Sequence, residues 1–161
     1  MTDFAGLLRV LNESGVEFIL IGGVAAAVHG AIRTTRDLDV VYARTSENFA
    51  RLAGALAPLN AYLRGAPPGL PFHWDVQTIA HGLNFTLDTS LGEIDVLGEI
   101  VGGGSYDQLK SHCVKVSAFG TECLCVDLDT LIWVKRAAGR PKDFEAIAEL
   151  EALREESQRS E

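Results

Sequence analysis

The sequence predicts an α+β fold, in which one mixed β-sheet packs with helices in a single domain. The chain has 161 residues, 47% of them hydrophobic, which suits one domain with a sizeable core. Short apolar runs typical of strands alternate with segments that have helical spacing. No internal repeat or linker divides the chain, so we expect one domain over residues 1–154 and a frayed tail over 155–161.

The first elements alternate between helix and strand. Helical spacing of apolar residues predicts a helix over 4–11. The apolar run 16–21 predicts a buried strand, which Gly22-Gly23 breaks. An alanine-rich helix is expected over 24–29 and a second strand over 38–42.

The middle of the chain is less regular. Ser46 can cap a helix that Pro58 stops, and a short strand is expected around Tyr62. Residues 65–82 form the longest irregular stretch, with one helical turn expected after Trp74. Loops of this length in compact domains are often functional or mobile. Trp74 and Phe72 could stack on a base, but anchoring of the loop is the favoured role.

Two hairpins are predicted in the second half. Residues 85–88 pair with 93–97, and residues 114–118 pair with 122–126. Between the hairpins we expect a flexible link over 102–104.

Capping signals predict the remaining helices. Ser105 and Gln108 form a capping box for a short helix. Asp127 caps a helix that ends at Ala138, and Pro141 opens the last helix.

Charge and cysteine content exclude several classes. The net charge of −8 argues against a whole surface that binds nucleic acid. An odd number of cysteines without a CxxC pair indicates neither a disulfide framework nor a zinc site. The sequence shows neither a secretory signal nor an apolar run that could span a membrane, so we expect a cytoplasmic protein.

The basic residues gather in two small groups within this acidic chain. Arg33 and Arg36 form one group, and the acid-free segment 131–142 holds the other. Local basic clusters of this kind fit a small bound anion better than a long polyanion. The second group comprises Lys135, Arg136, Arg140 and Lys142.

Acidic residues on two predicted strands are the main candidates for chemistry. Asp37 and Asp39 lie on one face of their strand, with Cα atoms roughly 6.6 Å apart. Carboxylates at this separation can converge on metal ions, and their oxygens are the ligands that magnesium prefers. Taken alone, an Asp-Leu-Asp segment favours a solvated strand end over a metal site.

A second strand carries two further acids on one face, Glu93 and Asp95. If it pairs beside Asp37 and Asp39, the crowded carboxylates would repel one another unless they bound cations or protons. The alternative is that Glu93 and Asp95 face water on an edge strand.

The Gly22-Gly23 pair stands between a buried strand and a helix. Glycine lets backbone N–H groups approach an anion, and a helix N-terminus favours negative charge, so this turn is a candidate phosphate cradle. The dinucleotide-binding GxGxxG and P-loop patterns are both absent from the sequence. A simple turn is the alternative interpretation.

The order of these motifs resembles a known family. The segments Ile21-Gly22-Gly23-Val24-Ala25, His29-Gly30, Arg33, Thr35 and Asp37-Leu38-Asp39 resemble the signature of nucleotidyltransferase-fold proteins related to DNA polymerase beta. Residues 135–143 (KRAAGRPKD) resemble a C-terminal motif of the bacterial branch that includes AbiEii-type toxins and small uncharacterised relatives. The motifs together reach from Val16 to Leu150.

This resemblance implies a nucleotidyltransferase-like mixed sheet with a metal site. Gly22 and Gly23 would hold the triphosphate, Asp37 and Asp39 would be the metal pair, and Asp95 would be the third acid. Many members have serine at the position of Gly23, and this departure favours the non-catalytic alternative given below. The chain also lacks room for the separate acceptor-binding domain of many such transferases.

The resulting hypothesis is a nucleotidyltransferase that uses two Mg²⁺ ions, with Mn²⁺ as a substitute. It would move a nucleoside monophosphate from a nucleoside triphosphate to a hydroxyl of RNA, protein or a small molecule, in a toxin–antitoxin or defence context. One ion would activate the acceptor hydroxyl and the other would stabilise the departing pyrophosphate. Asp95 could ligate the first ion or accept the proton.

Four cations are candidates for nucleotide contacts. They are Arg33, Lys135, Arg140 and Lys142. The alternative for Lys135 is a charge that suits the C-terminal turn of a helix. Asp143 is expected in the first turn of the last helix, and His29 is expected to be structural.

Two rival functions stay open. The first is a non-catalytic module of the same fold that binds a nucleotide or a partner protein, as an antitoxin does, or that forms a homo-oligomer. The second is an acidic scaffold without a ligand.

Overall fold

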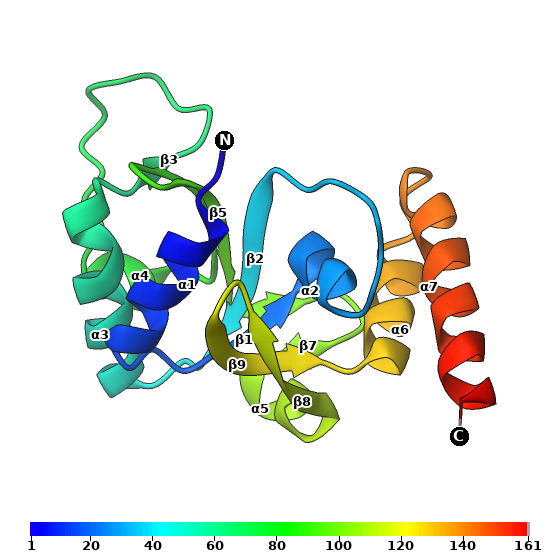
Figure 1. The fold of residues 1–161 in the computed structure, drawn as a ribbon. Coiled ribbons are helices and arrows are strands. Elements are labelled where there is room, and N and C mark those ends of the chain that lie inside the picture. The colour runs from blue at the N-terminus through cyan, green and yellow to red at the C-terminus, as the bar shows by residue number, and fades with distance from the viewer. Residues whose placement is uncertain (161) are drawn as a thin grey trace.

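A seven-stranded mixed sheet forms the centre of the protein. The computed structural model describes residues 1–160 (Figure 1). The strands follow the order β3-β4-β5-β2-β1-β9-β8, and β6 and β7 form a separate two-stranded sheet. The strands are β1 (Phe18–Ile21), β2 (Asp37–Tyr42), β3 (Tyr62–Leu63), β4 (Asn84–Thr89), β5 (Gly92–Leu97), β6 (Glu99–Ile100), β7 (Gly104–Ser105), β8 (Cys113–Ala118) and β9 (Thr121–Val126).

Helices pack on both sides of this sheet. Figure 1 shows α1, α3 and α4 gathered on one side and α2, α6 and α7 on the other. The helices are α1 (Phe4–Glu13), α2 (Gly22–Val28), α3 (Ser46–Leu56), α4 (Val76–His81), α5 (Tyr106–Leu109), α6 (Leu128–Ala138) and α7 (Asp143–Arg159). Short 3-10 helices follow α3 and α5 at Ala57–Leu59 and Lys110–His112. The predicted α+β class is confirmed.

The alternation of side chains along the central strands separates the core from the acidic face. β2 pairs with β1 in antiparallel and with β5 in parallel orientation. Leu38 and Val40 on β2, and Ile94 and Val96 on β5, are fully buried. Because successive strand residues point to opposite faces, the acids between them share the other face.

Local sequence signals account for most helix ends. The side chain of Asp127 accepts a hydrogen bond from the Thr130 N–H at the start of α6, and Gly139 ends that helix in the left-handed conformation. The predicted capping box of Ser105 and Gln108 is present at α5. These caps satisfy backbone groups that a helix terminus leaves unpaired.

Several predicted boundaries are wrong. α2 begins at Gly22, so the glycine pair forms its first turn rather than a break before it. Thr45, not Ser46, caps α3, because its side chain accepts from the Asn48 N–H. The predicted flexible link over 102–104 belongs to the hairpin of β6 and β7 instead, with Gly102 and Gly103 in its turn and Gly104 as the first residue of β7. α7 is helical through Arg159, and the predicted frayed tail over 155–161 stays a prediction.

The long irregular segment is anchored by aromatic residues. Trp74 is buried, and its Nε1 donates to the Leu52 carbonyl at 3.2 Å. Its ring packs edge-on against Phe85. Anchoring of the loop by Trp74 is thereby confirmed.

The three cysteines lie on β8 and β9 as free thiols. Burial raises the pKa of Cys125 to about 12, and the thiol therefore stays protonated and weakly nucleophilic.

Across residues 1–160, no helix combines the length and the apolar character needed to cross a membrane.

Candidate active site

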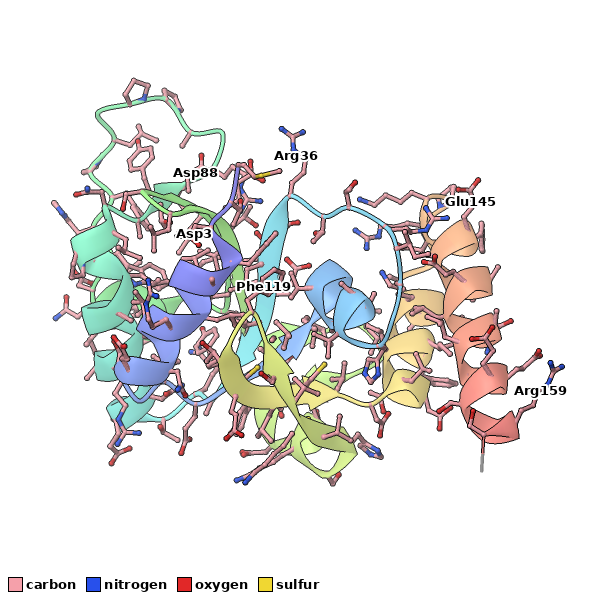
Figure 2. The ribbon with its side chains drawn as sticks, viewed as in Figure 1. Asp3, Arg36, Asp88, Phe119, Glu145 and Arg159 are labelled. Carbon is pink, nitrogen blue, oxygen red and sulfur yellow. The ribbon has the colours of Figure 1, made fainter. Side chains whose placement is uncertain are left out.

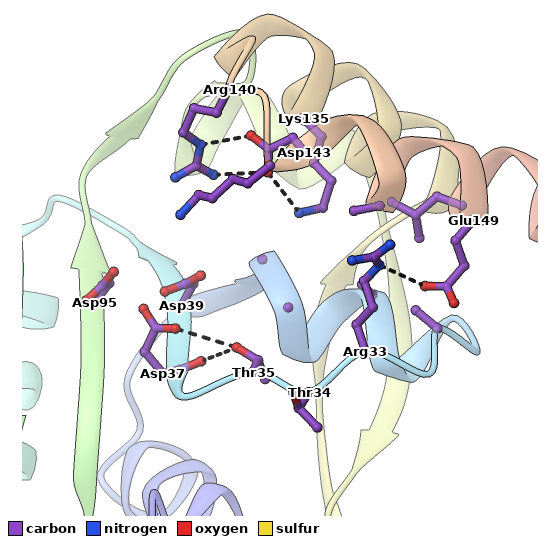
Figure 3. Close-up of a pocket in the computed structure, with 17 residues that line it drawn as sticks. Arg33, Thr34, Thr35, Asp37, Asp39, Asp95, Lys135, Arg140, Asp143 and Glu149 are labelled. Atoms are coloured by element: carbon purple, nitrogen blue, oxygen red, sulfur yellow. Dashed lines mark hydrogen bonds and ion pairs between the residues drawn. The ribbon is translucent and has the colours of Figure 1, made fainter.

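The parallel pairing of β2 with β5 brings acids from two separated segments together. Its register aligns Asp37 with Glu93 and Asp39 with Asp95. One carboxylate oxygen from each of Asp37, Asp39 and Asp95 lies within 4.8 Å of the others (Figure 3). We call these three residues the carboxylate triad. Glu93 lies outside this cluster, although the sequence placed it on the same face.

Burial and mutual repulsion control the protonation of the triad. Burial, followed by the charges of Asp37 and Asp95, raises the pKa of Asp39 to about 9. Burial and the charge of Asp37 also raise the pKa of Asp95. In each case the surroundings disfavour the ionised form.

The donor set of the triad fits a divalent metal ion. Asp39 Oδ1 is buried and has no hydrogen-bond partner among residues 1–160. A buried carboxylate oxygen without a donor needs a proton or a cation. Three converging carboxylates supply hard oxygen ligands and negative charge, as Mg²⁺ and Mn²⁺ prefer.

Arg64 lies beside the triad, although no pattern in the sequence predicted it there. Its Nη2 is 3.0 Å from Asp95 Oδ1, and its Nη1 is 3.8 Å from Asp37 Oδ2. Arg64 follows a two-residue strand and belongs to no motif. Only the pairing of β3 with β4 carries it to the acids, and a strand this short gives little signal in the sequence.

The glycine pair fits closely against the triad. Gly22 has a φ of 70°, and a Cβ atom there would lie 2.1 Å from Asp39 Oδ2. A Cβ atom at Gly23 would lie 2.6 Å from both Cβ and Oγ1 of Thr35. These contacts require glycine at both positions, so that backbone and side chains can approach each other.

A cavity of about 290 Å³ connects the triad with basic side chains. Figure 3 shows Lys135 and Arg140 across the cavity from Asp37, Asp39 and Asp95. Gly22, Gly23, Thr35, Arg33 and Lys142 also line it. The structure therefore brings the predicted acids, the glycine pair and four predicted cations to one cavity.

Asp143 organises the basic side of this cavity. It is 4% exposed, and its Oδ2 accepts from Arg140 Nε at 2.8 Å. Lys135 Nζ lies 3.9 Å from its Oδ1. Asp143 does lie in the first turn of α7, as predicted, but its pairing with Arg140 and Lys135 was missed. The three-residue spacing from Arg140 was the available signal.

Arg33 and Arg36 have different surroundings from each other. Arg33 lines the cavity, but its Nη2 is 3.2 Å from Glu145 Oε2 and its Nε is 3.7 Å from Glu149 Oε1. The Arg33 guanidinium is thus paired with two carboxylates of α7. Arg36 is exposed at the tip of the loop before β2 and points away from the protein (Figure 2).

His29 caps α2 away from the triad. Its Nε2 lies 2.8 Å from the Val126 carbonyl oxygen, which ties the end of α2 to β9. The predicted structural position near a helix end is confirmed.

A second cavity of about 310 Å³ also reaches the triad. It shares Gly22, Asp39, Asp95, Lys135 and Arg140 with the first cavity. Its remaining lining is mainly apolar: Ile21, Leu97, Ile100, Val101, Leu131, Val134 and Ala138, with Asn84 and Glu99. Asp39 and Asp95 therefore stand between a cavity rich in charged groups and one with an apolar wall.

Two solved structures are similar to this chain along most of its length. One is the solution structure of the antibiotic-resistance factor ANT(2'')-Ia, with 15% identity over 96% of this chain and 89% of that chain, and a TM-score of 0.56. The other is a crystal structure of ANT(2'')-Ia in complex with adenylyl-2''-tobramycin, with 15% identity over 92% and 83% of the two chains, and a TM-score of 0.54.

These likenesses establish the fold. The predicted nucleotidyltransferase-like architecture is confirmed by them. No protein-family model and no curated protein matches the chain.

Proposed function

We propose that the protein is a metal-dependent nucleotidyltransferase that moves a nucleoside monophosphate from a nucleoside triphosphate to an acceptor hydroxyl. The observation that carries this proposal is the convergence of Asp37, Asp39 and Asp95 at a cavity whose opposite side is basic. Phosphoryl transfer needs this combination, because catalysis depends mainly on positioning and on neutralising phosphate charge.

The triad would hold Mg²⁺ or Mn²⁺ through Asp37, Asp39 and Asp95. When bound, such ions supply Lewis-acid activation of the acceptor oxygen and neutralise charge on the phosphates. Asp95 would ligate one ion or accept the proton of the acceptor hydroxyl.

The basic side of the first cavity would bind the triphosphate. Gly22 and Gly23 let phosphate oxygens approach the backbone, as no side chain intervenes. Lys135, Arg140 and Lys142 would neutralise phosphate charge, with Arg33 contributing at the rim. Asp143 would hold Lys135 and Arg140 in place through its ion pairs.

The ANT(2'')-Ia complex supports the donor and the acceptor class. Its ligand, adenylyl-2''-tobramycin, is an adenylylated aminoglycoside. By analogy we propose ATP as the donor and a small molecule as the first acceptor class to test. RNA and protein acceptors follow from the proposed AbiEii-type branch and its toxin–antitoxin or defence context, which the KRAAGRPKD segment supports.

Pyrophosphate release with Mg²⁺, each of the four nucleoside triphosphates and each acceptor class tests the proposal. We expect Asp95→Asn to reduce the rate by at least about a hundredfold, because the triad would lose one ligand. Glu93→Gln, two residues away on β5 but outside the cluster, should retain most of the rate. Nucleotide binding without pyrophosphate release would instead identify the non-catalytic module.

A further inference from the structure

Arg64 is built into the edge of the sheet. Its backbone N–H donates to the Thr86 carbonyl at 3.0 Å, and its Nη2 donates to the Leu87 carbonyl at 2.8 Å. Its Nε lies 3.3 Å from Asp88 Oδ1. The side chain is only 22% exposed. Two side-chain contacts with β4, at Leu87 and Asp88, therefore hold the guanidinium in one place, and the backbone contact with Thr86 fixes the residue that carries it.

From this position the guanidinium faces two of the three carboxylates in the triad. The ion pairs to Asp95 Oδ1 and Asp37 Oδ2 measure 3.0 and 3.8 Å. The hydrogen bond of Nη2 goes to the Leu87 carbonyl, while its contact with Asp95 lacks hydrogen-bond geometry. Arg64 therefore acts on the acids through its charge more than by orienting them.

We propose that Arg64 is a fixed counter-charge that weakens the binding of free divalent ions to the triad, so that the ion is retained only together with a triphosphate. When a cation displaces the protons of the triad, its three carboxylates carry −3, and the guanidinium beside Asp95 and Asp37 opposes this with +1. Asp88, the partner of Arg64 Nε, lies outside the triad and is 52% exposed, so it offsets the guanidinium charge only in part. A positive charge held this close to two ligands repels an incoming cation. A triphosphate would restore the missing negative charge from the other side of the cavity.

This inference rests on the proposed function, because it assumes that the triad is the cation site. It differs from a positioning role, in which Arg64 would hold Asp95 ready as a ligand. The two roles predict opposite effects: removing a competing charge strengthens ion binding, whereas removing a positioning group weakens it.

Binding of Mn²⁺ to the full-length protein, measured by electron paramagnetic resonance without nucleotide, tests the inference. Arg64→Gln and Arg64→Met remove the charge, and we expect each to bind Mn²⁺ about tenfold more tightly than the wild type. Glutamine retains a donor for the Leu87 carbonyl and so provides a second neutral variant if methionine impairs folding. Arg64→Lys keeps the charge and should remain close to the wild type.

Arg9→Met is the matched control, because it removes the same charge from an exposed position on α1. Its affinity for Mn²⁺ should equal that of the wild type. Addition of an α,β-methylene triphosphate should tighten Mn²⁺ binding more in the wild type than in Arg64→Gln.

Unchanged or weaker Mn²⁺ binding in both neutral variants would overturn the inference, as would a comparable gain in Arg9→Met. Failure of the neutral variants to bind Mn²⁺ at all would also overturn it. Pyrophosphate release by the wild type tests the proposed function separately. If the wild type releases pyrophosphate but the neutral variants bind Mn²⁺ no more tightly than it does, the Arg64 inference fails and the proposed function stands.

Discussion

Asp39 and Asp95 are register partners across the parallel pairing of β2 and β5. This pairing joins acids that lie more than fifty positions apart in the sequence into one cluster. The same register places Asp37 opposite Glu93, yet only Asp37 joins Asp39 and Asp95 at the cavity. The arrangement is electrostatically costly without a cation, and this cost can be measured.

Asp39 should make the metal-free protein less stable as the pH rises. Its pKa lies at about 9 in the folded state against an ordinary value of 3.8, so the folded state binds the proton more tightly. The contribution of this proton to the free energy of unfolding is complete below pH 3.8 and is lost as the pH rises toward 9. The loss is at most about 1.4 kcal/mol per pH unit. Thermal unfolding in EDTA from pH 5 to 9 measures this loss.

In the same series, Asp39→Asn should flatten the pH dependence and raise the melting temperature at pH 8. Mg²⁺ should have a similar effect on the wild type, since an ion replaces the proton. Glu93→Gln should leave the slope in place. A wild-type slope that Asp39→Asn does not change would show that Asp39 is not the titrating group.

Gly22→Ala should lower both the stability and the rate of transfer. The new Cβ would lie 2.1 Å from Asp39 Oδ2, at a φ that L-residues rarely adopt. Gly120→Ala is the matched control, because Gly120 has a φ of 83° with no atom within 4 Å of the added Cβ. Backbone strain alone costs about 1 kcal/mol, so we expect a larger loss at Gly22. Equal losses by urea denaturation would refute a close contact with Asp39.

Gly23→Ser would introduce the residue that the resemblance to nucleotidyltransferases leads one to expect, but it should not improve activity. A Cβ at this position would lie 2.6 Å from the Thr35 Cβ, so the substitution should destabilise the protein by about 1–3 kcal/mol. Thr35→Gly should relieve part of this loss in the double variant. A double-mutant cycle of unfolding free energies measures the coupling, and simple additivity would contradict the contact.

Asp143→Asn should weaken nucleotide binding as well as stability. The carboxylate is nearly buried and pairs with Arg140 and Lys135, so its loss releases both cations from their positions. We expect about a tenfold rise in the dissociation constant for a triphosphate, which calorimetry can measure. Asp129→Asn removes an ion pair with Arg154 at a side chain that is 76% exposed, and should have little effect. Equal behaviour of the two variants would exclude a special role for Asp143.

Local chemistry explains what could be predicted from the sequence. Period-two alternation placed Asp37 with Asp39 on one face, and caps such as Asp127 and Gly139 bounded a helix correctly. The acid-free segment pointed to Lys135 and Arg140, both of which line the cavity. Each of these signals lies within a few neighbouring residues.

What could not be predicted depends on pairings between distant segments. The alignment of β5 with β2 decides that Asp95 joins the cluster and Glu93 does not, and no local pattern specifies this register. Arg64 reaches the acids only because the short β3 pairs with β4. The second cavity is formed by residues from several elements and has no sequence motif.

The most direct test of the metal site is a crystal structure with Mn²⁺ and an α,β-methylene triphosphate, using the anomalous scattering of manganese. We predict an anomalous peak bounded by carboxylate oxygens of Asp37, Asp39 and Asp95, with the phosphates extending past Gly22 toward Lys135 and Arg140. A peak remote from these three carboxylates, or none at millimolar Mn²⁺ and triphosphate, would contradict a metal-dependent nucleotidyltransferase site here.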